Sequence, residues 1–304
     1  MNTSSMGIEQ ISDNTRNILI TGGCGFLGRH LVSLLREKGY NPVVLDNMDP
    51  LCGGKGKPDA YGDVRSLDFI VEVLGKNRIW GVLHLAAYGR NLTCKSYPVN
   101  AWNINTCGTQ NVLEAAYCDP WVKRVVCCSS NIALSDVPTV YRASKRAVES
   151  LVEVYASQGV SCMALRPSNI HGSGQSKTEF QMCAFAGMDS TYLKTGHFFV
   201  SGNGTQSRDW VHAQDVARAF TLALESDVVG LALDVCTGRQ TSMNEIAVML
   251  DVPVEYTDPR PGDAKMLVSD PEPARRLLGF EARVGLEDSI WDSFPSVPRC
   301  GCTI

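Results

Sequence analysis

The sequence lacks the features by which several common classes of protein are recognised. Its 12 cysteines include no Cys-x-x-Cys pair, which excludes a zinc ribbon and a thioredoxin-type site. The net charge is −4 and no long basic run occurs, so nucleic acid and anionic membranes are not expected partners. No apolar run reaches the roughly 18 residues of a membrane helix, and no leader pattern opens the chain. We therefore expect a protein of the reduced cytoplasm.

Three further absences concern cofactors and anchors. Histidine, aspartate and glutamate form no cluster with metal-ligand spacing, so we expect no metal site. The glycine-rich segment 53–58 places Pro58 where a Walker loop needs serine or threonine, which excludes a P-loop. Cys302 is third from the end, whereas CaaX prenylation requires the fourth-from-last position.

What the first half does contain is a regular alternation of apolar runs and helical patterns. The runs are continuous in valine, isoleucine and leucine, which is typical of parallel strands covered on both faces. This alternation predicts a doubly wound parallel α/β sheet, because parallel neighbours need crossover helices. The expected strands are 18–21, 42–46, 81–85, 124–128 and 161–166, and the expected helices are 28–38, 67–74, 105–117 and 141–157.

After Pro167 the pattern loosens, and glycine, serine and threonine become frequent. A helix at 213–225 and a strand at 231–235 nevertheless have the pattern needed to rejoin the sheet. We therefore predict two discontinuous domains. The first comprises 1–168 and 209–236, and the smaller, C-terminal substrate domain comprises 169–208 and 237–304.

The stretch NILITGGCGFLGRH, at 17–30, places Gly22, Gly25 and Gly28 between an apolar strand and the apolar pattern of a helix. Gly22 permits a tight turn, Gly25 lets the main chain approach a pyrophosphate, and Gly28 lets helix and strand pack closely. The second strand ends at Asp46, about 20 residues on, where a carboxylate can bind a ribose 2′-hydroxyl. The same carboxylate would repel a 2′-phosphate. The pattern predicts a Rossmann-like dinucleotide site that favours NAD over NADP.

Ten motifs follow one another in a recognisable order along the chain. They are TGGCGFLG, LDN, GDVRSLD, VLHLAA, NTCGTQNVLEA, SSN, YRASK, LRPSNIHG, RDWVHAQDVA and RPGD. From 17 to 292 the chain thereby resembles the extended short-chain dehydrogenase/reductase family, in its NAD-dependent nucleotide-sugar epimerase/dehydratase branch. The resemblance implies a Rossmann-like doubly wound parallel sheet with a smaller, discontinuous C-terminal substrate domain.

The resemblance also assigns residues to the cofactor and the substrate. Asp63 and Val64 would flank the adenine, and Asn105 would brace the active-site backbone. Asn169, Arg208 and Arg260 would bind the nucleoside diphosphate, with Asp263 supporting Arg260. Arg90 would lie on the sugar-facing loop. The residues implied for NAD are Gly22, Gly25, Phe26, Leu27, Gly28, Asp46, Asn47, Asp63, Val64, Leu85, Ala86, Ala87, Asn105, Tyr141, Lys145 and Pro167.

The motif YRASK places Tyr141 and Lys145 four residues apart, on one face of a helix. A tyrosine is a poor base at its ordinary pKa of about 10. A neighbouring ammonium and a cationic nicotinamide ring would both favour the phenolate and lower that pKa. The phenolate could then take a proton from a sugar hydroxyl as hydride leaves the same carbon. Ser130 would orient the substrate oxygen, with Ser129 as the alternative if the strand register shifts.

Two departures from the family pattern bear on the reaction. Asn131 and Ile132 stand where 4,6-dehydratases carry an Asp-Glu pair, so the usual acid and base for elimination are lacking. The link between Ser130 and Tyr141 is also short, which predicts an open sugar pocket. We interpret three other polar residues, His84, His212 and Asp215, as structural rather than catalytic.

These observations favour an NAD-dependent nucleotide-sugar 4-epimerase, with a UDP-sugar preferred, acting through a transient 4-keto sugar. A dehydratase or a 4-keto-sugar reductase of the same family is the enzymatic alternative. A non-catalytic module that senses NAD or a nucleotide is the alternative of another class, since the fold alone permits it. Family analogy also predicts a homodimer formed through the helices at 105–117 and 141–157.

Overall fold

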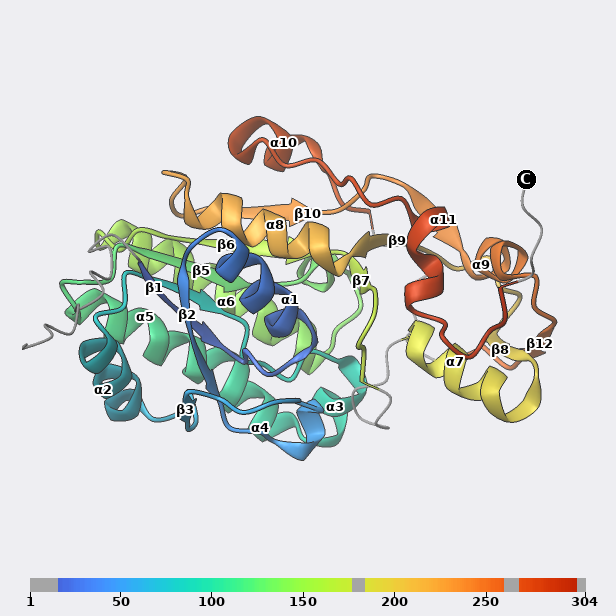
Figure 1. Cartoon of the computed structure of the whole chain (residues 1–304), viewed down its shortest axis with the longest axis horizontal. Coiled ribbons are helices and arrows are strands. Elements are labelled where there is room, and N and C mark those ends of the chain that lie inside the picture. Colours follow the sequence, from blue (N-terminus) through green and yellow to red (C-terminus); the bar gives the residue numbers. More distant parts are fainter. Residues whose placement is uncertain (1–15, 177–183, 260–267, 300–304) are drawn as a thin grey trace, which may run out of the picture.

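The computed structural model describes residues 16–176, 184–259 and 268–299. A seven-stranded parallel sheet with strand order β10-β6-β5-β4-β1-β2-β3 forms the larger part (Figure 1). It is built from β1 (Asn17–Thr21), β2 (Asn41–Asp46), β3 (Ala60–Tyr61), β4 (Gly81–His84), β5 (Arg124–Cys128), β6 (Cys162–Pro167) and β10 (Ala232–Val235). Thus the fold class predicted from the sequence is confirmed. The strand expected at 231–235 is β10, and it does join the sheet.

Helices cover both faces of this sheet (Figure 1). On one face lie α1 (Phe26–Glu37) and α8 (Ala213–Leu224), and on the other lie α2 (Leu67–Asn77), α5 (Gly108–Cys118) and α6 (Val140–Ser157). Along β1, Leu19 packs into one core cluster, while Ile18 and Ile20 pack into the other. Because alternate residues face opposite sides of a strand, a strand buried on both faces must be apolar throughout.

The connection between β4 and α5 contains short helices that the sequence analysis did not predict. These are α3 (Asn91–Ser96), α4 (Pro98–Trp102) and a π-helical turn (Asn103–Cys107). The helix expected from residue 105 therefore becomes α-helical only at Gly108. Short 3-10 turns occupy Pro50–Cys52, Asn131–Leu134 and Ile290–Asp292.

The smaller region consists of short strands and helices at one end of the sheet (Figure 1). A three-stranded sheet has the order β11-β9-β7, and a two-stranded sheet pairs β12 with β8. A second apolar core contains Phe185, Phe198, Trp210 and Phe294. The elements are β7 (Asn169–His171), α7 (Ala184–Thr195), β8 (Phe198–Ser201), β9 (Ser207–His212), β11 (Gln240–Ser242), α9 (Met243–Leu250), β12 (Val254–Thr257) and α11 (Leu286–Ser289). Helix α10 (Glu272–Leu278) lies instead with the larger region.

Not all of the C-terminal chain stays with this second core. Ala274 and Leu278 of α10, together with Phe280, pack into the cluster around α1 and α8. The chain therefore crosses between the two cores more than once. Across the described residues, no helix has both the length and the apolarity needed to cross a membrane.

Candidate active site

The turn between β1 and α1, together with the start of α1, contains the three glycines that the sequence analysis assigned to a dinucleotide site. Gly22 has a φ of +70°, and a Cβ there would lie 2.8 Å from the backbone nitrogen of Ala86. A Cβ at Gly28 would lie 2.5 Å from the carbonyl oxygen of Gly22. Gly25 caps the N-terminus of α1 without any side-chain hydrogen bond, which leaves first-turn N–H groups available to an anion. This turn has the shape of a phosphate cradle.

Asp46 lies at the end of β2, directly beside that turn. Its Oδ2 accepts a hydrogen bond from the backbone nitrogen of Cys24 at 3.0 Å, and its Oδ1 accepts one from Met48 at 2.8 Å. A carboxylate offers about four lone-pair positions, so two remain for ligand hydroxyls. Next to it, the Asn47 amide donates to Asp63 Oδ2 at 3.0 Å, which ties together two residues predicted for the adenosine end.

One cavity of about 1620 Å³ joins nearly all the predicted site residues. Among those in the described part of the chain, only Asn105 does not line it. Arg260 and Asp263 lie outside the described residues. The predicted residues that line the cavity are Gly22, Gly25, Phe26, Leu27, Gly28, Asp46, Asn47, Asp63, Val64, Leu85, Ala86, Ala87, Arg90, Ser130, Tyr141, Lys145, Pro167, Asn169 and Arg208.

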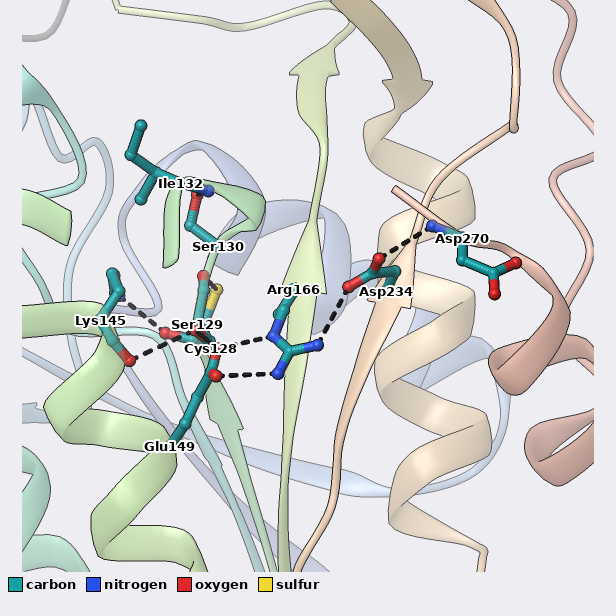
Figure 2. A network of polar contacts seen from close by, with 9 residues as sticks. All are labelled: Cys128, Ser129, Ser130, Ile132, Lys145, Glu149, Arg166, Asp234 and Asp270. Carbon is teal, nitrogen blue, oxygen red and sulfur yellow. Dashed lines mark hydrogen bonds and ion pairs between the residues drawn. The ribbon is translucent and has the colours of Figure 1, made fainter. Parts of the chain in front are cut away.

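Tyr141 and Lys145 lie one turn apart on α6, on the face that packs against the end of β5. The Lys145 ammonium donates to the carbonyl oxygen of Cys128 at 2.7 Å and lies 5.9 Å from the centroid of the Tyr141 ring. Ser130 and Tyr141 line the same cavity, and Ser130 is one of the groups that lower the pKa of Tyr141, whereas the Ser129 hydroxyl is directed to Glu149 (Figure 2). This geometry favours Ser130 over Ser129 as the serine that meets a substrate.

The electrostatics of Tyr141 differ in direction from the shift that the sequence suggested. Burial raises the pKa of this phenol above its ordinary value, while the hydrogen bond from Ser130 and the charge of Arg90 act in the opposite direction. The chain alone therefore keeps the phenol protonated. Activation as predicted needs the positive charge of a nicotinamide ring in addition to Lys145.

Asn105 braces the backbone around the site, as the resemblance implied, from within the π-helical turn. Its side chain accepts a hydrogen bond from the Tyr88 nitrogen at 2.8 Å and donates to the Tyr88 carbonyl at 3.1 Å. The same amide donates to Ser144 Oγ, which in turn donates to the carbonyl oxygen of Tyr141. Asn105 thus links the loop after β4 to the start of α6. π-Helical turns are frequent at functional sites.

His84 lies beneath this region without reaching the cavity. It is held between the hydroxyls of Thr21 and Thr109, at 2.7 and 3.0 Å. Burial lowers the pKa of its imidazole to about 3, so the ring is neutral. Within the described residues, no group of three or more His, Cys, Asp or Glu side chains is arranged to hold a metal ion.

His212 and Asp215 fix the start of α8. His212 Nδ1 accepts from the Gln214 backbone nitrogen at 3.3 Å, which caps the helix. Asp215 is buried, and its Oδ2 accepts from the backbone nitrogens of Arg283 and Val284, both at 2.8 Å. These contacts are of the structural kind that the sequence analysis assigned to both residues.

Asn131 and Ile132, the two residues that replace the dehydratase acid pair, both line the cavity. They begin a 3-10 turn directly after Ser130, whose Oγ accepts from the Ile132 nitrogen at 3.3 Å. The buried Asn131 amide donates to Ser269 Oγ at 3.4 Å. No carboxylate stands at either position.

The far end of the cavity is formed by the smaller region. Asn169 begins β7 and lies beside Trp210 of β9, where the two strands run parallel. Arg208 and Trp210 both line the cavity, and no described residue accepts a hydrogen bond from the buried Trp210 indole nitrogen. A polar ligand at this end would meet the Arg208 guanidinium. The sequence analysis named Arg208 but missed Trp210, although the motif RDW contains both.

Comparison with known proteins agrees with this geometry. The model of the NAD dependent epimerase/dehydratase family matches residues 18–235, more than half of the chain. A putative UDP-glucose 4-epimerase of Methanocaldococcus jannaschii is 29% identical, over 90% of this chain and 95% of that protein.

Two crystal structures show the same likeness in three dimensions. UDP-glucose 4-epimerase from Thermotoga maritima, solved with UDP-glucose, has a TM-score of 0.83 at 27% identity, covering 92% of this chain and 98% of that one. The enzyme of the same name from Thermus thermophilus, solved with NAD, has a TM-score of 0.79 at 27% identity with the same coverage. The chain belongs to the NAD-dependent epimerase/dehydratase family.

Proposed function

We propose that this protein is a nucleotide-sugar 4-epimerase that prefers a UDP-sugar and acts through a transient 4-keto sugar. The observation that carries the proposal is the shared cavity. It brings Ser130, Tyr141 and Lys145 together with the glycine turn at one end and Arg208 at the other. Relatives of similar length that bear the name UDP-glucose 4-epimerase support the same reading.

NAD is the cofactor of this enzyme, and the residues present fit it. The cradle of Gly22, Gly25 and Gly28 suits the pyrophosphate, because added side chains there would collide with backbone. Asp46 suits the adenosine ribose and disfavours a 2′-phosphate. When bound, NAD supplies a reversible hydride acceptor at the carbon that is to be inverted.

The chain's own residues supply proton transfer and orientation. Tyr141 Oη takes the proton from the sugar hydroxyl and later returns it to the keto oxygen. Ser130 Oγ hydrogen-bonds the same sugar oxygen and restricts its orientation. Lys145 stabilises the phenolate form through its positive charge and holds the nicotinamide ribose. Arg90, on the loop after β4, is proposed to face the sugar.

The second half of the cavity is proposed to hold the nucleoside diphosphate. A guanidinium such as that of Arg208 suits phosphate oxygens through charge-assisted hydrogen bonds. Asn169 lies on the neighbouring strand, and Arg260 with Asp263 is proposed to complete this end. The proposed division of labour follows the predicted domains, 1–168 with 209–236 for NAD and 169–208 with 237–304 for the nucleotide sugar.

A homodimer is proposed through α5 and α6. Tyr117 on α5 and Val154 on α6 are exposed apolar side chains on helices that pack against each other. A second copy covering these helices would remove that apolar surface from water. The proposed localisation is cytoplasmic.

Product identification tests the proposed function. Purified protein with NAD is to be incubated with UDP-, dTDP- and GDP-sugars, and the sugar products identified. We expect a 4-epimer of a UDP-sugar with no net formation of reduced cofactor. A keto-deoxy product would show a dehydratase. A 4-keto sugar formed together with an equal amount of reduced cofactor, which is the reverse of the reductase reaction, would show a reductase. Binding of NAD without turnover of any sugar would favour a sensing module.

A further inference from the structure

Two side chains of α6 hold the end of β5, one residue after the other (Figure 2). The Lys145 ammonium donates to the carbonyl of Cys128, and the Ser129 hydroxyl donates to Glu149 Oε1. Lys145 and Glu149 are four residues apart, so they lie one above the other on the same helix face. The catalytic helix is thereby fastened to the strand that leads directly into Ser130.

Glu149 is in turn held by a bidentate arginine. Arg166 of β6 donates through Nε and Nη2 to the two Glu149 carboxylate oxygens, at 2.8 and 2.9 Å (Figure 2). Its remaining nitrogen donates at 3.3 Å to Asp234 on β10, whose other oxygen accepts from the Asp270 backbone nitrogen. One guanidinium therefore joins α6, β6 and β10. The paired geometry fixes the orientation of the Glu149 carboxylate.

Stability alone is a weak explanation for this arrangement. The side chains of Glu149, Arg166 and Asp234 are only 13%, 20% and 8% exposed. Removing such charges from water costs about as much as their attraction returns, so apolar residues would serve folding equally well. What an apolar cluster would not supply is a directional acceptor for the Ser129 hydroxyl.

That acceptor determines where Ser130 points. Ser130 has extended backbone angles, and successive residues of an extended chain face opposite sides. With the Ser129 side chain fixed toward α6, the Ser130 side chain is turned to the opposite side of the chain, and Ser130 lines the cavity together with Tyr141. A slip of one residue would exchange the two serines.

We infer that Glu149, clamped by Arg166, is a positioning residue that directs Ser130 and Lys145 at Tyr141. The inference rests on the proposed function, in which those three residues act on the sugar. Glu149 itself does not line the cavity. It acts through Ser129 and through the attachment of α6 to β5.

Glu149→Ala removes the acceptor, and Glu149→Gln keeps an acceptor while removing the charge. We expect kcat of Glu149→Ala to fall about 100-fold, as for misplacement of a reacting group by about 1 Å, while KM for the sugar changes less than about threefold. The kinetic isotope effect with a 4-deuterated sugar should rise, because hydride transfer becomes slower than product release. The kcat of Glu149→Gln should lie between those of Glu149→Ala and the wild type. If the alanine variant does not fold, the glutamine variant replaces it in the test.

Asp215→Asn is the matched control. Asp215 is also a buried carboxylate paired with an arginine, Arg218, at 2.7 Å, but its contacts fix only α8 and the chain near residue 283. This variant should lower the unfolding midpoint while keeping kcat within about twofold. If Glu149→Ala keeps kcat within about threefold, or loses no more than Asp215→Asn, the inference is wrong.

Hydrogen exchange separates this inference from the proposed function, because it needs no sugar. In Glu149→Ala, backbone amides of 129–134 should exchange at least about tenfold faster than in wild type. In Asp215→Asn the same amides should exchange at about the wild-type rate. Equal exchange in the two variants would overturn the inference even if the wild type epimerises UDP-sugars. If the wild type turns over no sugar, the proposed function is wrong, but the hydrogen-exchange comparison still tests whether Glu149 positions residues 129–134.

Discussion

The two regions of the molecule offer a ligand different kinds of contact. The seven-stranded region presents backbone N–H groups at the glycine turn, and Asp46 is itself fixed there by two backbone donors. The smaller region presents side chains, among them Arg208, Asn169 and the indole of Trp210. Backbone contacts at a rigid turn suit a cofactor that every family member shares. Side-chain contacts can change from one member to the next, so we expect recognition of the nucleoside diphosphate to depend on the smaller region.

The proposed catalytic residues sharpen this contrast, because all three lie on the seven-stranded region. Chemistry and cofactor binding should therefore respond to substitutions there, and affinity for the nucleoside diphosphate to substitutions in the smaller region. Three measurements test that separation, beginning with the largest expected effect, and a fourth concerns the stability of the smaller region.

Tyr141→Phe removes the hydroxyl that is proposed to carry the proton. We expect kcat to fall by about 10²–10⁴-fold with little change in KM, since the ring and its packing remain. Steady-state kinetics with a UDP-sugar gives the result. The control is Tyr155→Phe on the same helix, whose hydroxyl donates to Glu114 at 2.7 Å, away from the cavity. Equal losses in the two variants would remove Tyr141 from the mechanism.

Gly22→Ala tests the cofactor cradle. The new Cβ would lie 2.8 Å from the Ala86 nitrogen, so the turn must open and its N–H groups must move. NAD affinity, measured by calorimetry, should fall about 100-fold or more. Gly39→Ala is the control, because Gly39 also has positive φ, +82°, but a Cβ there meets nothing within 4 Å. If both variants bind NAD equally, the cradle is not the cofactor site.

Arg208→Ala tests the smaller region. Loss of a charge-assisted hydrogen bond to phosphate, about 1.5–3 kcal/mol, should raise KM for the UDP-sugar about 10–100-fold. NAD affinity should not change. Arg239→Ala removes an exposed arginine that pairs with Glu287, and it should leave KM unaltered. A fall in NAD affinity on loss of Arg208 would contradict the separation of the two regions.

The smallest effect concerns stability in the smaller region. His171 is buried on β7, and burial lowers the pKa of its imidazole to about 3. Since the unfolded chain takes up this proton below about pH 6.5 and the folded chain does not, stability falls as pH falls through that window. From pH 7 to pH 5 this one group accounts for about 2 kcal/mol. Urea unfolding of His171→Leu should show a pH dependence shallower by that amount.

The sequence predicted most of the first region because its signals are local. Continuous apolar runs identify strands buried on both faces, and three glycines between β1 and α1 identify the cradle. Tyr141 and Lys145 were named from the motif YRASK together with the glycine turn and Asp46, and helix periodicity places the two side chains on one face. Within the described part of the chain, the remaining site residues named from resemblance, except for Asn105, line the cavity, which their positions in the sequence do not by themselves require.

Other features depend on contacts between distant segments and have no local signal. The π-helical turn that contains Asn105 is determined by its hydrogen bonds to Tyr88 and Ser144, each contributed by another element. The burial of Tyr141 and the resulting rise in its pKa likewise depend on tertiary packing. Glu149 had a local signal, since it lies one turn beyond Lys145, but its partner Arg166 belongs to a separate strand.

The strand order has a consequence for synthesis of the chain. β6 lies between β5 and β10, yet β10 follows β6 only after α7, β8, β9 and α8 have been made. Until Val235 has left the ribosome, one side of the apolar β6 has no neighbour to pair with. Unpaired strands of this kind are templates for association with other chains. Nascent or truncated chains that stop before β10 should therefore depend on chaperones, and they should aggregate when chaperones are scarce.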